Sequence, residues 1–202
     1  MAGKNRFDQT RLINIANCLT ALRVLLVPLF VYLLLAGRGK EALVVFVICG
    51  VADAFDGILA RRLRLRTKVG AYLDAIADKI LMATSFIVLA YINVAPLWLA
   101  VLVISRDIFI LVGGALFLML INHTDIKPTQ ISKLNTTVQI VTVVYFLAYA
   151  AFPELRLWNF MSIREYCALT LLIVFVCATT TAVSGAQYLY IGLKTLSNEN
   201  EQ

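Results

Sequence analysis

Charged residues are scarce in this chain. Only 15% of its 202 residues are charged and 61% are hydrophobic, whereas an ordinary soluble domain is about a quarter charged and about half apolar. The sequence has a single histidine, and its four cysteines lie in apolar segments without the spacing of a zinc site. It also contains no nucleic-acid-binding motif. These shortages argue against a soluble domain, a zinc protein and a partner that is a nucleic acid.

The hydrophobic residues form six long segments. They cover residues 18–36, 42–60, 69–91, 96–121, 131–152 and 166–191. Each is close to the ~20 residues that a helix needs to cross a hydrocarbon core. The sequence therefore predicts an all-α integral membrane protein with six transmembrane helices. A single domain is expected over residues 1–202, with a short interfacial segment at 1–13 and a flexible tail at 196–202. A signal peptide is the alternative for the first segment, but that segment is longer than a signal core.

The basic residues are unevenly divided between the expected loops. With six spans both termini lie on one side, and that side holds most of the Lys and Arg residues, including the run from Arg61 to Lys68. The positive-inside rule places both termini and this run in the cytoplasm. Anionic lipid head groups then explain the basic balance. A bacterial inner membrane is the expected location, and a processed organellar protein is the alternative.

Four aspartates stand in the second and third apolar segments. Asp53 and Asp56 are three residues apart and Asp74 and Asp78 are four apart, so each pair shares a helix face. The short connection predicts antiparallel neighbouring helices with both pairs near their cytoplasmic ends. Ionised side chains within a span cost about 2.5–3.5 kcal/mol each, so protonation or a divalent cation is needed. An all-oxygen ligand set suits Mg, Mn or Ca, and Mg²⁺ favours a phosphate-bearing substrate.

Small and basic residues accompany the aspartates. Gly57, Ala60 and Gly70 would let a ligand approach the backbone, although small residues also serve helix packing in membranes. Arg61 supplies a cation for phosphate oxygens, or alternatively a positive-inside anchor.

These residues form the string Asp-x2-Asp-Gly-x2-Ala-Arg-x8-Gly-x3-Asp-x3-Asp between Asp53 and Asp78. It resembles the signature of the CDP-alcohol phosphatidyltransferases at every fixed position and spacing. The resemblance implies a six-helix membrane enzyme, commonly a homodimer, that uses a CDP-linked lipid such as CDP-diacylglycerol. It further implies a set of roles. Asp53, Asp56 and Asp74 would bind Mg²⁺ or Mn²⁺, expected as a pair of ions. Asp78 would complete the metal site and act as the catalytic base. Gly57, Ala60 and Gly70 would line the cytidine pocket, with Arg61 near a phosphate.

The first apolar segment adds to this resemblance. The string from Asn14 to Arg23, followed by Pro28, is similar to the opening of the phosphatidylglycerophosphate synthase and cardiolipin synthase branches. Asn17 and Thr20 would then hydrogen-bond the nucleotide and Arg23 would reach a phosphate. Helix capping is the alternative for Asn17 and Thr20.

Three later residues, Arg106, Lys133 and Asn135, are the candidates for binding the acceptor alcohol. The strings around them, and Thr179–Ser184, resemble the eukaryote-type cardiolipin synthase branch. The glycerophosphate branch usually has a second lysine at the position where this chain has Asn135. It also has a further arginine at a position that falls at Gly113 or Gly114 here. A free phosphomonoester needs more positive charge than a phosphodiester. Phosphatidylglycerol is therefore the expected acceptor, with cardiolipin and CMP as products, and glycerol 3-phosphate is the alternative.

Two other classes of function are alternatives for these carboxylates. A cation transporter also places carboxylates in a helix bundle, but it needs them along a path to both sides. A purely structural member of the family would have little reason to retain every signature residue, since intramembrane charges are costly.

Overall fold

The computed structural model describes residues 25–63, 68–120, 130–152 and 163–199. Within these ranges, the side chains of 53–63, 68–75, 114–120, 163–167 and 193–199 are not described. The regular elements in the described ranges are all α-helices. They are Leu25–Leu35, α2 (Gly39–Leu63), α3 (Lys68–Tyr91), α4 (Leu97–Leu120), α5 (Gln130–Ala151) and α6 (Ile163–Glu199). The prediction of an all-helical fold is confirmed, and α2 to α5 match the apolar segments to within a few residues.

Two tight turns reverse the chain direction between successive helices. After Leu25–Leu35, Gly37 has a positive φ of 72°, and the Arg38 and Gly37 amides donate to the carbonyls of Leu33 and Leu34. After α3, Asn93 has a φ of 58° and the same pattern of bonds to the last helical turn. Glycine and asparagine tolerate this left-handed conformation, which satisfies the last carbonyls of a helix. Gly37 and Asn93 therefore help to set where Leu25–Leu35 and α3 end.

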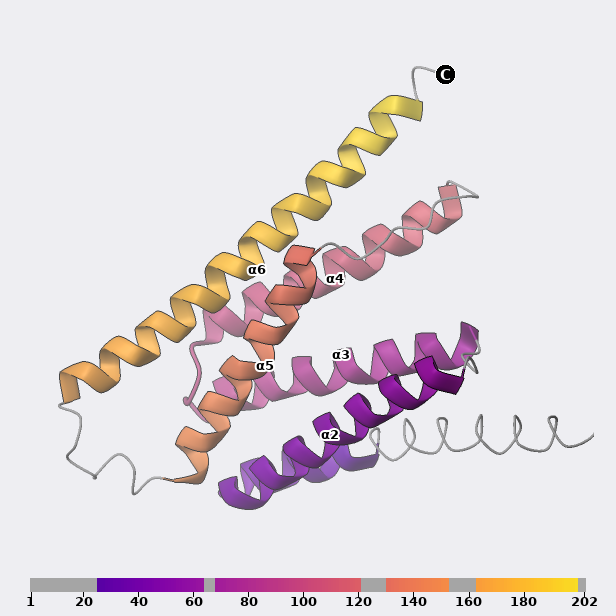
Figure 1. The fold of residues 1–202 in the computed structure, drawn as a ribbon. Coiled ribbons are helices and arrows are strands. Elements are labelled where there is room, and N and C mark those ends of the chain that lie inside the picture. The colour runs from indigo at the N-terminus through magenta and orange to yellow at the C-terminus, as the bar shows by residue number, and fades with distance from the viewer. Residues whose placement is uncertain (1–24, 64–67, 121–129, 153–162, 200–202) are drawn as a thin grey trace, which may run out of the picture.

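The helices form a layered bundle in which α5 crosses between the α2–α3 side and the α4–α6 side (Figure 1). Helix α5 contacts α2, α3 and α6, and α4 contacts α3 and α6. In Figure 1, α2 and α3 run in opposite directions, with the end of α2 and the start of α3 at the same end of the molecule.

The apolar core is formed by buried residues of Leu25–Leu35 and of all five helices from α2 to α6. Phe30, Phe86 and Phe146 are fully or almost fully buried there, and the rings of Phe30 and Phe46 lie 5.9 Å apart. Gly39 begins α2 directly against α5, since a Cβ on this residue would lie 2.7 Å from the carbonyl oxygen of Ala150. A small residue lets two helix backbones approach closely, as is common in membrane bundles.

Within the described residues, two helical segments are long and apolar enough to cross a membrane. They are Gln130–Ala151 and Ala168–Gly192. Many large apolar side chains on the helix surfaces are exposed, including Leu171, Leu172 and Phe175 of α6.

Candidate functional site

The backbone places the four signature aspartates on two helices. Asp53 and Asp56 lie in the last part of α2, and Asp74 and Asp78 lie in the first half of α3. Because α2 and α3 run in opposite directions, the two pairs belong to the same end of the molecule (Figure 1). The oxygen chemistry of these four side chains fits a hard divalent cation.

Much of the predicted donor site falls outside what the structure describes. Asp78 has a described side chain and is partly buried. The side chains of the other signature residues are not described, namely Asp53, Asp56, Gly57, Ala60, Arg61, Gly70 and Asp74, and Asn17, Thr20 and Arg23 lie outside the described residues altogether. The described side chains alone contain no group of three metal-binding residues. The roles of the donor-site residues therefore stay predictions.

A buried ionic cluster lies next to this end of α3. Asp107 of α4 accepts through one oxygen, Oδ1, from Lys79 Nζ at 2.6 Å and from Arg106 Nη1 at 2.7 Å. The Arg106 side chain is only 5% exposed, Asp107 is 12% exposed and Lys79 is 29% exposed. Buried charges need partners of opposite sign. One carboxylate here serves two cations, which leaves this cluster with a net formal charge of +1.

Arg106 connects the cluster to two further helices. Its Nη2 donates to Ser132 Oγ of α5 at 2.8 Å and to Ser184 Oγ of α6 at 2.5 Å. Side chains of α3, α4, α5 and α6 are therefore joined through one guanidinium and one carboxylate.

A second polar layer follows one turn further along α5. Asn135 is fully buried, and its Oδ1 accepts from Thr181 Oγ1 of α6 at 3.0 Å. Gln139 is also buried. Arg106 Nε, Asn135 Nδ2 and Gln139 Nε2 are buried donors without a partner among the described residues. An unsatisfied buried donor costs about 1–3 kcal/mol, so these groups would gain from oxygen atoms supplied by a ligand or by water.

The three predicted acceptor-site residues differ in their surroundings. Arg106 and Asn135 are buried where α4, α5 and α6 meet, whereas Lys133 is exposed on α5. The sequence patterns indicate no role for the partners of Arg106 and Asn135, which are Asp107, Ser132, Ser184 and Thr181, or for Lys79, which pairs with Asp107. Asp107 directly follows Arg106 in α4, whereas the other contacts join residues of different helices and so cannot be recognised from local spacing.

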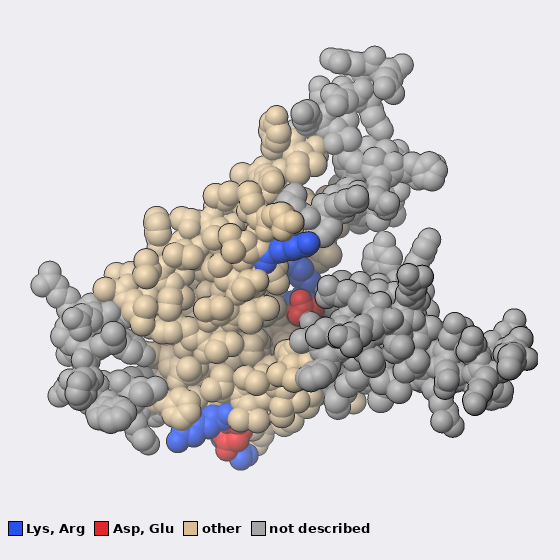
Figure 2. Space-filling view, viewed as in Figure 1, with Lys and Arg blue, Asp and Glu red and all other residues tan. Residues whose placement is uncertain are grey.

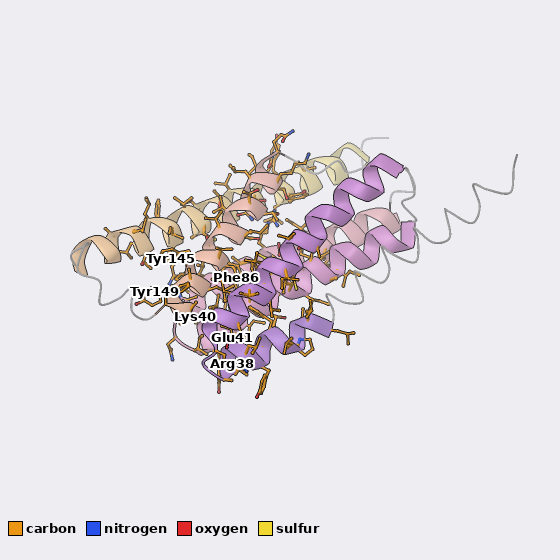
Figure 3. All side chains as sticks on the ribbon, turned by 60° about the horizontal axis from the view of Figure 1, so that its bottom comes forward. Arg38, Lys40, Glu41, Phe86, Tyr145 and Tyr149 are labelled. Carbon is orange, nitrogen blue, oxygen red and sulfur yellow. The ribbon has the colours of Figure 1, made fainter. Side chains whose placement is uncertain are left out.

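Charged side chains gather at two places on the face shown in Figure 2. One place is the hollow beside the grey atoms, and the other is at the lower edge. The described residues supply a second charged group at the start of α2, where Arg38 Nη2 pairs with Glu41 Oε1 at 2.9 Å and Lys40 Nζ lies 5.3 Å from the centre of the Phe152 ring. Figure 3 labels this group. A backbone hydrogen bond and then a side-chain bond from Arg38 lower the pKa of Glu41. Its residues are exposed, unlike the buried cluster.

Comparison with known families places the chain in a class. Residues 13–183 match the family described as CDP-alcohol phosphatidyltransferase. The chain therefore belongs to the CDP-alcohol phosphatidyltransferase family, a family of membrane enzymes, and the predicted resemblance is confirmed.

The individual relatives fall into two groups. The chain is 35% identical to a probable phosphatidylglycerophosphate synthase of Mycobacterium tuberculosis, over 69% of this chain and 68% of that protein. It is 30% identical to the CDP-diacylglycerol–glycerol-3-phosphate 3-phosphatidyltransferase of Bacillus subtilis, over 93% of this chain and 99% of that protein. It is 32% identical to the cardiolipin synthase (CMP-forming) of Rattus norvegicus, over 91% of this chain and 63% of that protein. The chain is thus about equally similar to phosphatidylglycerophosphate synthases and to cardiolipin synthases.

Proposed function

We propose that this chain transfers a phosphatidyl group from CDP-diacylglycerol to the hydroxyl of phosphatidylglycerol, which gives cardiolipin and CMP. The family supplies the class of reaction. The proposed setting is a six-span protein, a homodimer in a bacterial inner membrane, with both termini and the reacting end in the cytoplasm.

The proposed donor site uses the signature residues. Asp53, Asp56, Asp74 and Asp78 would hold Mg²⁺ or Mn²⁺ beside the CDP diphosphate. A bound divalent cation would offset the negative charge of the diphosphate. The cytidine and phosphates would contact Asn17, Thr20, Arg23, Gly57, Ala60, Arg61 and Gly70.

Asp78 is the proposed base. It takes the proton from the acceptor hydroxyl, and the freed oxygen attacks the phosphorus on the lipid side of the diphosphate. The bond from that phosphorus to CMP then breaks, and CMP leaves. A carboxylate is a weak base, so this step depends on a hydroxyl held within hydrogen-bond distance of it.

The observation that carries the choice of acceptor is the buried, uncharged amide of Asn135. This position usually carries a lysine in the glycerophosphate branch. Here an amide accepts from Thr181, and its donor Nδ2 has no partner among the described residues. Arg106 is already paired with Asp107. Lys133 is then the exposed cation on this part of α5. The described acceptor residues therefore offer little positive charge that is not already paired. Since a dianionic phosphomonoester needs more positive charge than a phosphodiester, this favours the phosphodiester acceptor.

Glycerol 3-phosphate is the second candidate acceptor, and the similarity to the enzymes of Bacillus subtilis and Mycobacterium tuberculosis favours it. Purified protein supplied with CDP-diacylglycerol and Mg²⁺ or Mn²⁺ should be given each acceptor separately. Cardiolipin formed from phosphatidylglycerol supports the first proposal, and product formed only from glycerol 3-phosphate contradicts it.

A further inference from the structure

The contact between α3 and α4 involves a residue adjacent to the proposed base. Lys79 directly follows Asp78 in the sequence. Its Nζ lies 2.6 Å from Asp107 Oδ1, which also accepts from Arg106 Nη1. A displacement of Lys79 along α3 therefore displaces the backbone of Asp78 by a similar amount.

The other partner in this contact is held firmly. Asp107 is paired with Arg106, and the Arg106 guanidinium is in turn held by Ser132 of α5 and Ser184 of α6. Charged hydrogen bonds are short and directional. The Asp107 side chain is therefore held in place, through Arg106, by the helices that carry the proposed acceptor residues.

Apolar packing elsewhere on α3 is less suited to fixing the position of α3 along α4. Beyond Lys79 the buried residues of α3 include Leu81, Phe86 and Leu89. Contacts of this kind stabilise the bundle, but the hydrophobic effect is non-directional. An ion pair between two helices is better suited to setting the position of one helix along the other.

We propose that Lys79 and Asp107 are positioning residues for the acceptor step, because their ion pair fixes the Asp78 segment of α3 relative to the polar residues of α4, α5 and α6. This inference rests on the proposed function, in which Asp78 receives the proton of the acceptor hydroxyl. A misplacement of about 1 Å is enough to cost on the order of 10²-fold in rate.

The variant Lys79→Gln tests the inference with little risk to folding. Lys79 is 29% exposed, and its removal leaves the buried pair of Asp107 and Arg106 intact. We expect kcat to fall roughly 10-fold to 100-fold. The KM for CDP-diacylglycerol should stay within about threefold of wild type, because Asp53, Asp56 and Asp74 would still hold the metal beside the CDP diphosphate. Lys79→Arg restores the cation and should recover at least half of the lost kcat.

Lys40→Gln is the matched control, since it makes the same change in the exposed charged group at the start of α2. Asp107→Asn is the second variant and should reproduce the fall in kcat. The inference would be overturned if Lys79→Gln had the same kcat as the Lys40→Gln control. It would also be overturned if the kcat of Lys79→Arg were no higher than that of Lys79→Gln. A rise in the CDP-diacylglycerol KM as large as the fall in kcat would overturn it as well. Failure of the wild-type protein to release CMP with either acceptor contradicts the proposed function instead.

Discussion

Two regions of the bundle are held together by different kinds of contact. Where α2 begins and α5 ends, the contacts are between aromatic rings and between Gly39 and the α5 backbone. Near the start of α5, the contacts involve the Arg106 guanidinium, the Asp107 carboxylate and the Asn135 amide. The first region is what a helix bundle needs in order to be stable. The second is costly, because buried ion pairs are often no more stabilising than apolar residues of the same volume. Such a region is expected where a protein handles a polar substrate, and it lies beside the helix that carries Asp78.

The largest expected effect comes from the base. Asp78→Asn should lower turnover by roughly 10²-fold to 10⁴-fold, since this is the usual contribution of a general base. Binding of CDP-diacylglycerol should stay measurable, because the other three aspartates are retained. The measurement is CMP release together with a CDP-lipid binding assay. Glu41→Gln, a similar change in the exposed charged group, is the control. Wild-type turnover in Asp78→Asn would refute the assigned role.

Removing the Arg106 guanidinium should lower the stability of the folded protein more than any other change considered. Arg106→Met leaves Ser132 and Ser184 without this donor and leaves Asp107 with Lys79 alone. Breaking a buried pair in this way costs about 3 kcal/mol. Thermal unfolding in detergent should therefore show a clearly lower midpoint than wild type. An unchanged midpoint would mean that the cluster does not hold α4, α5 and α6 together.

A glycine pair tests the apolar region. Gly39→Ala places a methyl group 2.7 Å from the Ala150 carbonyl oxygen, and this backbone cannot move aside easily. The expected cost is about 1–3 kcal/mol, with turnover per folded molecule unchanged. Gly50→Ala, also in α2, meets no atom within 4 Å and should be neutral or slightly stabilising. Equal unfolding midpoints for the two variants would contradict the close packing of α2 on α5.

The smallest effect is expected at a single hydroxyl of the polar region. Thr181→Val removes the donor to Asn135 Oδ1 and leaves a buried amide unsatisfied, at a cost of about 1 kcal/mol. The KM for the acceptor should rise while the KM for CDP-diacylglycerol stays the same. Thr179→Val is the control, because within the described part of the chain its exposed hydroxyl bonds only to carbonyls of its own helix. Identical acceptor KM values in both variants would separate Asn135 from acceptor binding.

The sequence predicted the helices well and the contacts between them poorly. The length of each apolar run is a local property, so the bounds of α2 to α5 could be predicted to within a few residues. The spacing of the signature aspartates is local as well, and it indicated the family correctly. Asp107 and Lys79 could not be paired in advance, because their contact depends on how α3 packs on α4. For the same reason, nothing near Asn135 in the sequence revealed its bond to Thr181.

Competition between the two acceptors shows directly which one the enzyme uses. Phosphatidylglycerol and glycerol 3-phosphate would be offered together to the purified wild-type protein, with CDP-diacylglycerol and Mg²⁺ or Mn²⁺, and the lipid products would be separated and compared with the CMP released. We expect cardiolipin as the main product, formed in a one-to-one ratio with CMP. Phosphatidylglycerophosphate as the main product would contradict this expectation.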